Sequence, residues 1–154
     1  MQFDVLLASA AELIENQPSA LSALSNASAF LMDNIPDLNW AGFYLFDGKR
    51  LVVGPFQGHV ACAEILIGSG VCGEAARDLV TRTVDDVTTY SNHIACDANS
   101  RSEAVVPLIR DGVMVGVLDV DSPLHARFDA GTVRFLERFA DLVVKTVDFS
   151  GLPV

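Results

Sequence analysis

The amino-acid sequence predicts an α+β fold, in which an antiparallel sheet carries the N- and C-terminal helices on one face. Apolar residues recur at helical spacing at both ends of the chain, whereas the middle alternates short apolar runs with turn signals. The chain has 154 residues, 51% of them hydrophobic and 19% charged, which favours one compact core over disorder. We therefore expect a single domain over residues 1–154.

Two helices are expected before residue 36 and one near the C-terminus. From Phe3 to Ile14 the apolar side chains share one helical face, and Ser19 can cap a second helix that Pro36 ends. The last helix is expected to begin near Asp129. The expected parts are an N-terminal helix pair (residues 1–36), a central sheet with loops (39–128) and a C-terminal helix (129–148).

Six strands are expected in the central part, where β-branched and aromatic runs are separated by turns. They cover Trp40–Phe46, Leu51–Phe56, Ala63–Ile67, Val80–Val84, Ala104–Ile109 and Val113–Asp121. A short helix is expected over Val71–Leu79. The polar stretch Asp85–Ser102 reads as a long loop, which in a compact domain is usually functional.

Charge and composition exclude several classes of partner. The formal charge of −10 repels a phosphate backbone, so nucleic acid is not expected to bind. Apolar runs are strand-sized and too short to span a bilayer. No Lys or Arg precedes the first apolar stretch, which argues against a secretory signal and for a cytoplasmic protein. Three cysteines are too few for a disulfide framework, so thiols are expected at rest.

Asp119 and Asp121 are candidates for ligand binding, because they share one face of the most apolar strand. The alternative is that this strand simply reaches the surface there. Glu103 begins the partner strand. A two-residue loop at Asp111-Gly112 would place Glu103 opposite Val120, whereas a three-residue loop with a bulge would place it opposite Asp119 or Asp121. Three converging carboxyl groups would suit an ammonium group together with an oxygen that must be protonated.

The cysteines allow three interpretations. They are buried inert thiols, or they form a metal site, or they carry redox chemistry. Two His-x-x-Cys units, His59–Cys62 and His93–Cys96, could supply a Cys₂His₂ set. Redox chemistry is favoured by the polar loop around Cys96 and by the place of Cys72 near a helix start, since both settings can lower a thiol pKa.

Trp40 and Tyr44 fall on one strand face, with Gly42 between them leaving room above the sheet. Aromatic residues in strands usually pack in the core. The same pair could instead form an aromatic wall for a methylthio group, because sulfur and methyl contacts with rings are favourable.

Six motifs in order resemble the free methionine-(R)-sulfoxide reductases, which are GAF-domain enzymes. The motifs are Asn39–Leu45, Gly54–Gly58, Gly70–Gly73, His93–Ala98, Ser102–Glu103 and Gly116–Ser122, and the resemblance extends from Asn39 to about Phe128. It implies a single GAF domain with a six-stranded antiparallel sheet flanked by N- and C-terminal helices. It also implies a pocket closed by loops, and a homodimer.

The resemblance further implies a role for each matching residue. Cys96 would be the nucleophile, Cys62 the resolving cysteine and Cys72 an additional thiol. Glu103, Asp119 and Asp121 would bind the substrate, and Trp40 and Tyr44 would form the wall that holds its methylthio group. Within that set, Glu103 and Asp121 are assigned to the sulfoxide oxygen and Asp119 to the ammonium group.

The implied reaction needs no metal or organic cofactor. A thiolate attacks the sulfoxide sulfur, a carboxylic acid protonates the oxygen, and the resulting sulfenic acid condenses with a second thiol to a disulfide that thioredoxin reduces. Two alternatives remain: a GAF module that senses a small ligand without chemistry, and a thiol peroxidase, which would need no carboxylate cluster. The sequence does not determine which cysteine pair forms the first disulfide or what role Cys72 has.

Overall fold

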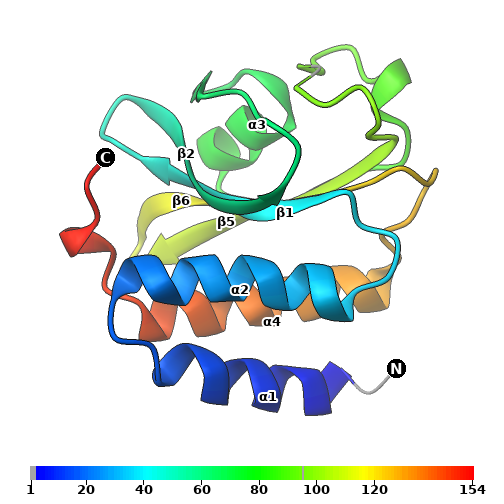
Figure 1. Ribbon diagram of the computed structural model, residues 1–154. Coiled ribbons are helices and arrows are strands. Elements are labelled where there is room, and N and C mark those ends of the chain that lie inside the picture. The colour runs from blue at the N-terminus through cyan, green and yellow to red at the C-terminus, as the bar shows by residue number, and fades with distance from the viewer. Residues whose placement is uncertain (1–2, 95) are drawn as a thin grey trace.

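The computed structural model describes residues 3–94 and 96–154 and confirms the predicted α+β architecture (Figure 1). Residues 1–2 and Ala95, which belongs to the His93–Ala98 motif, lie outside the described residues. The six strands are β1 (Trp40–Phe46), β2 (Arg50–Gly58), β3 (Glu64–Leu66), β4 (Arg82–Val84), β5 (Ser102–Arg110) and β6 (Val113–Ser122). They form one antiparallel sheet in the order β3-β2-β1-β6-β5-β4.

Three helices cover one face of this sheet. Helices α2 (Ala20–Asn34) and α4 (Ala130–Thr146) lie directly against it, and α1 (Phe3–Glu15) packs outside them (Figure 1). The predicted cap at Ser19 is present, since the amide of Ser22 donates to Ser19 Oγ at 3.0 Å, and Asp129 caps α4 by accepting from the Thr132 amide at 2.8 Å. The main apolar core fills this side. In the described part of the chain, no helix has both the length and the apolar character needed to cross a bilayer.

The opposite face carries one short helix and the long loops. Helix α3 (Gly70–Asp78) lies over β5 and β6 and closes a second, smaller core (Figure 1). The predicted loop Asp85–Ser102 contains one 3₁₀ turn, η1 (Val87–Thr89), and a second, η2 (Phe149–Gly151), follows α4. Because α3 and these loops cover only part of this face of the sheet, a small molecule can reach side chains on the face between them.

The β5–β6 hairpin reaches the register that brings Glu103 opposite Asp121, but by a different route from the three-residue loop considered above. The turn is a two-residue one, with positive φ at both Asp111 and Gly112. Val115 is the extra residue of a bulge between the Ile109–Met114 and Leu108–Gly116 pairs. The bulge shifts every later pair by one residue and so puts the carboxyl groups of Glu103 and Asp121 on the same face.

Candidate functional site

The predicted site residues line one cavity on the loop-covered face of the sheet. Strands β1, β5 and β6 supply its floor, helix α3 one wall, and the segments around Val60 and Cys96 its mouth. Of the residues singled out from the sequence, the cavity is lined by Trp40, Tyr44, Cys72, His93, Cys96, Glu103, Asp119 and Asp121. Among the described residues, Cys62 and His59 are not part of this lining.

An aromatic wall stands on β1. The Trp40 and Tyr44 rings stack with centroids 5.8 Å apart, and the Phe56 ring stacks with Trp40 at 5.0 Å. The spacing of the sequence suggested that Gly42 leaves room above the sheet, but the structure shows no open space there. A Cβ built at Gly42 would lie 2.3 Å from Phe56 Cβ. The glycine therefore admits Phe56, which the sequence had not identified as part of the wall.

The polar atoms of the Trp40 and Tyr44 side chains bind the backbone of the segment that carries Cys62. Trp40 Nε1 donates to the carbonyl of His59 at 3.2 Å, and Tyr44 Oη donates to the carbonyl of Cys62 at 3.2 Å. Burial and the neighbouring acidic groups raise the pKa of Tyr44, so its hydroxyl stays a donor. The aromatic pair thus positions the backbone of one cysteine while its ring faces border the cavity.

Three carboxyl groups converge on the cavity floor. The register pairs Glu103 with Asp121 and places Asp119 two residues away on the same face of β6. Their residues are only 5% to 9% exposed. Burial, with a further contribution from Asp121, raises the pKa of Asp119 to about 8. Burial, reinforced by the adjacent acids, also raises the pKa of Glu103 and of Asp121 well above the usual range.

This cluster therefore holds protons at neutral pH, because three buried charges of one sign at this spacing cannot coexist without a cation. In the part of the chain that the structure describes, Asp119 Oδ1 is buried and has no hydrogen-bond partner. A buried acceptor of this kind is costly unless a ligand satisfies it. The floor thus offers protonated oxygens that can donate and one free oxygen that can accept.

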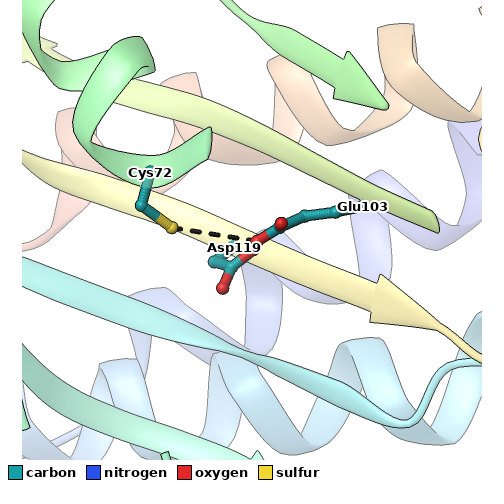
Figure 2. A group of neighbouring side chains, drawn as sticks. All are labelled: Cys72, Glu103 and Asp119. Atoms are coloured by element: carbon teal, nitrogen blue, oxygen red, sulfur yellow. Dashed lines mark hydrogen bonds between the residues drawn. The ribbon is translucent and has the colours of Figure 1, made fainter. Parts of the chain in front are cut away.

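Cys72 adds a thiol to the same cluster. Cys72 lies on α3, and its Sγ donates a hydrogen bond to Glu103 Oε2 at 3.9 Å (Figure 2). The sequence-based expectation that a helix start lowers this pKa is wrong, because burial and the acids at Asp119 and Glu103 raise the pKa of Cys72 well above its usual range. Cys72 is a protonated, buried thiol in this site.

A cation could in geometric terms use the same group, since Cys72, Glu103 and Asp119 offer ligand atoms within 4.8 Å of one another. The raised pKa of all three favours the protonated forms, which bind one another by hydrogen bonds and are poor metal ligands. The cluster is thus suited to storing and delivering a proton.

Cys62 and Cys96 form a disulfide, with their Cα atoms 5.4 Å apart. This differs from the expectation of three resting thiols, and it arises because the loop after β2 and the loop before β5 meet over the cavity mouth. Sulfurs bonded to each other cannot serve as metal-binding thiolates, so the proposed Cys₂His₂ set is not assembled in this form. Burial lowers the pKa of His93, which leaves its ring neutral near pH 7 and without a charge to offer Cys96.

The loop that carries Cys96 is fastened on both sides of the cysteine. Upstream, Glu74 on α3 accepts hydrogen bonds from Tyr90 Oη and, at 2.9 Å, from Asn92 Nδ2. Downstream, Asn39 Nδ2 donates to Asp97 Oδ2 and to Ser100 Oγ, both at 3.1 Å. Glu74 was not predictable from the sequence, because an acid on a short helix has no pattern that distinguishes it from a solvent-facing residue.

Comparison with known proteins gives consistent relatives. The GAF domain family matches residues 22–148. The free methionine-R-sulfoxide reductase of Escherichia coli is 45% identical over 141 residues, covering 89% of this chain and 85% of the relative. The reductase of the same name from Saccharomyces cerevisiae is 43% identical over 152 residues, covering 94% and 84%. The X-ray structure of free methionine-R-sulfoxide reductase from Neisseria meningitidis in complex with its substrate matches with a TM-score of 0.91 at 38% identity, over 96% of this chain and 89% of that one.

Proposed function

The chain belongs to the GAF-domain family of free methionine-R-sulfoxide reductases, and we propose that it reduces free methionine-(R)-sulfoxide to methionine through Cys96 and Cys62. The observation that carries this proposal is the Cys62–Cys96 disulfide at the mouth of a cavity whose floor holds three protonated carboxyl groups. Sulfoxide reduction by thiols needs both a sulfur nucleophile and an acid, and one cavity supplies them. A module that only senses a ligand needs neither.

The substrate is held by complementary groups. The ammonium group satisfies Asp119 Oδ1, the buried oxygen that otherwise has no partner among the described residues. The methylthio group lies against the Trp40 and Tyr44 rings, whose contacts with sulfur and methyl are favourable. The sulfoxide oxygen accepts hydrogen bonds from the Glu103 and Asp121 carboxyl groups, which face each other across β5 and β6.

The chemistry proceeds in steps that balance. The Cys96 thiolate forms a bond with the sulfoxide sulfur while Glu103 or Asp121 protonates the oxygen. The hydroxyl group then passes to the Cys96 sulfur as the sulfur–oxygen bond and the new sulfur–sulfur bond break, so that methionine leaves and Cys96 becomes a sulfenic acid. The Cys62 thiol then attacks the Cys96 sulfur and water departs, giving the disulfide. Cys72, with its raised pKa, acts as a hydrogen-bond donor that keeps Glu103 in place.

The family resemblance also supports a thiol reductant of the thioredoxin type, a homodimer, and operation in the reducing environment of the cytoplasm, where the disulfide would be transient. No metal or organic cofactor enters the proposed steps. Selectivity for the free amino acid follows from the floor, because a peptide-bound residue has no ammonium group to satisfy Asp119.

The deciding assay measures oxidation of reduced thioredoxin with three substrates: free methionine-(R)-sulfoxide, the (S) epimer and N-acetylmethionine sulfoxide. Only the first should be consumed at a significant rate. Equal turnover of the blocked substrate would contradict the assignment of Asp119 to the ammonium group, and no turnover of any of them would contradict the proposed function.

Two cysteine variants separate the roles. Cys96→Ser should abolish methionine formation, since a hydroxyl is far less ionised than a thiol and cannot become a sulfenic acid. Cys62→Ser should still form about one methionine per chain in a single turnover and then stop. Loss of that first turnover in Cys62→Ser, or its survival in Cys96→Ser, would reverse or refute the assignment.

A further inference from the structure

The two segments that carry the disulfide contain no charged residue. Residues 51–63 and 87–96 together hold 23 positions without Asp, Glu, Lys or Arg, although the chain has 30 such residues in 154 and a formal charge of −10. At that frequency four or five charges would be expected in 23 positions. Asp97, the acid that follows Cys96 in the sequence, accepts hydrogen bonds from the Asn39 side chain and the Asn99 amide.

Exposed apolar side chains accompany the disulfide in these segments. Val60 is 88% exposed and Ile94 is 38% exposed, and both border the cavity mouth together with Cys96. Ile94 is fixed in place, since its side chain packs over Gly70, where a Cβ would lie 3.1 Å from the Ile94 side chain. Val60 and Ile94 thus place two exposed apolar side chains beside the disulfide at the cavity mouth, and apolar side chains of this kind can form the buried centre of a contact with another protein.

The two sulfurs of the disulfide have different surroundings. Cys96 lines the cavity, where its thiolate is needed for the next turnover. Cys62 lies outside that lining, and its carbonyl, but not its sulfur, is bound by Tyr44. Both cysteines are half-buried, so they differ in the side that each faces: attack on Cys62 from solvent, past Val60, would release Cys96 towards the cavity.

We propose that Val60, Ile94 and the Cys62–Cys96 disulfide between them form a docking surface, the reductant face, for a dithiol protein with an apolar contact surface around its reactive thiol, and that this thiol attacks Cys62. This inference rests on the proposed function, because the reduction of one sulfoxide oxidises two thiols that must be regenerated. An uncharged face suits such a partner, since it imposes no like-charge repulsion from a strongly acidic chain.

The exchange balances in two steps. The partner thiolate forms a bond with Cys62 Sγ while the Cys62–Cys96 bond breaks, and Cys96 departs as a thiolate. The second thiol of the partner then attacks its own sulfur in the mixed disulfide. Cys62 is released as a thiol and the partner leaves as an intramolecular disulfide, so two electrons have passed to this chain.

A trapping experiment tests the site of attack. The oxidised protein is mixed with a thioredoxin variant whose second active-site cysteine is serine, so that the reaction stops at the mixed disulfide, and the linked peptides are identified by mass spectrometry. A link to Cys62 is the expected result. A link to Cys96, or no mixed disulfide, would overturn the proposal.

A matched pair of variants tests the reductant face. Val60→Asn should slow trapping by thioredoxin about five- to tenfold, the factor expected when one valine is no longer buried at an interface. Val113→Asn replaces a valine that is 63% exposed at the far end of β6 from Asp121, and it should trap at the normal rate. Reduction by dithiothreitol, which needs no docking surface, should be equal in both. Equal trapping rates for the two variants would refute the docking surface.

The trapping readouts use no methionine sulfoxide and are therefore independent of the proposed function. If the chain forms no methionine in a single turnover but is linked at Cys62, the proposed function fails and the reductant face stands. If it forms methionine but is linked at Cys96, the reductant face fails alone.

Discussion

Replacing Asp119 with Asn should stabilise the substrate-free protein at neutral pH, although it removes the carboxyl group that we propose binds the ammonium group of the substrate. Asp119 is buried, and its pKa is raised from 3.8 to about 8. The folded protein therefore keeps a proton that the unfolded chain releases between about pH 4 and pH 8. Because the folded state binds more protons across this window, the free energy of unfolding falls as pH rises through it and levels off above about pH 8. Asparagine cannot ionise, so the variant lacks this loss.

The size of the effect follows from the shift. At pH 7 the solution pH lies about three units above the pKa that Asp119 has in the unfolded chain. Each unit corresponds to about 1.4 kcal/mol, so the free energy of unfolding is lowered by roughly 4 kcal/mol. Glu103 and Asp121 compete for the same protons, so removing one acid returns only part of this. We expect Asp119→Asn to gain about 2–4 kcal/mol at pH 7, or about 5–15 °C in Tm, and little or nothing at pH 4.

Urea unfolding of the oxidised protein at pH 4, 6, 7 and 8 measures this difference. Asp78→Asn is the control of opposite sign, because hydrogen bonds from Arg77 and Arg82 lower the pKa of Asp78. Its carboxylate stabilises the folded state at neutral pH, and this contribution is lost only as pH falls. The reasoning would be refuted if Asp119→Asn were no more stable than the parent at pH 7, or if both proteins had the same slope of stability against pH.

Three further substitutions separate the roles within the site. In rapid-mixing experiments Glu103→Gln should slow formation of the sulfenic acid by about 10²-fold or more, because the acid is lost, whereas Asp119→Asn should mainly raise KM. Cys72→Ser should keep its rate within a few-fold, since a hydroxyl can still donate to Glu103; complete loss would mean that this thiol exchanges electrons. Glu74→Ala should lower kcat/KM by up to about tenfold, with faster amide exchange around Tyr90, and unchanged exchange there would mean that Glu74 does not hold the loop.

The fold was largely predictable because each element has a local signal. Strand β1 was predicted with the bounds it has, and the caps at Ser19 and Asp129 mark the starts of α2 and α4. The β5–β6 register was not predictable, since Val115 has no feature that identifies it as a bulged residue. Its position depends on pairing with both neighbouring strands. One such residue decided whether Glu103 faces the site.

Eight residues singled out from the sequence line the cavity, but their ionisation was not predictable. A position near a helix start suggests an activated thiol, yet the pKa of Cys72 is raised because the strands beneath it carry three acids and α3 excludes water. Such an effect depends on what lies above and below a residue in space. The contacts of Glu74 with Tyr90 and Asn92 have the same origin, since the residues lie 16 and 18 positions apart in the chain.

The protonated floor also explains why one cavity can select the substrate and activate it. Without a cation the three acids hold protons, and in the proposed function the ammonium group of the substrate is the cation that allows Asp119 to ionise. That carboxylate then raises the pKa of Glu103 further, so Glu103 keeps the proton that the sulfoxide oxygen needs. A sulfoxide within a peptide brings no cation and leaves Asp119 without a partner in the bound state. Recognition of the amino group and retention of the catalytic proton thus depend on the same pair of charges.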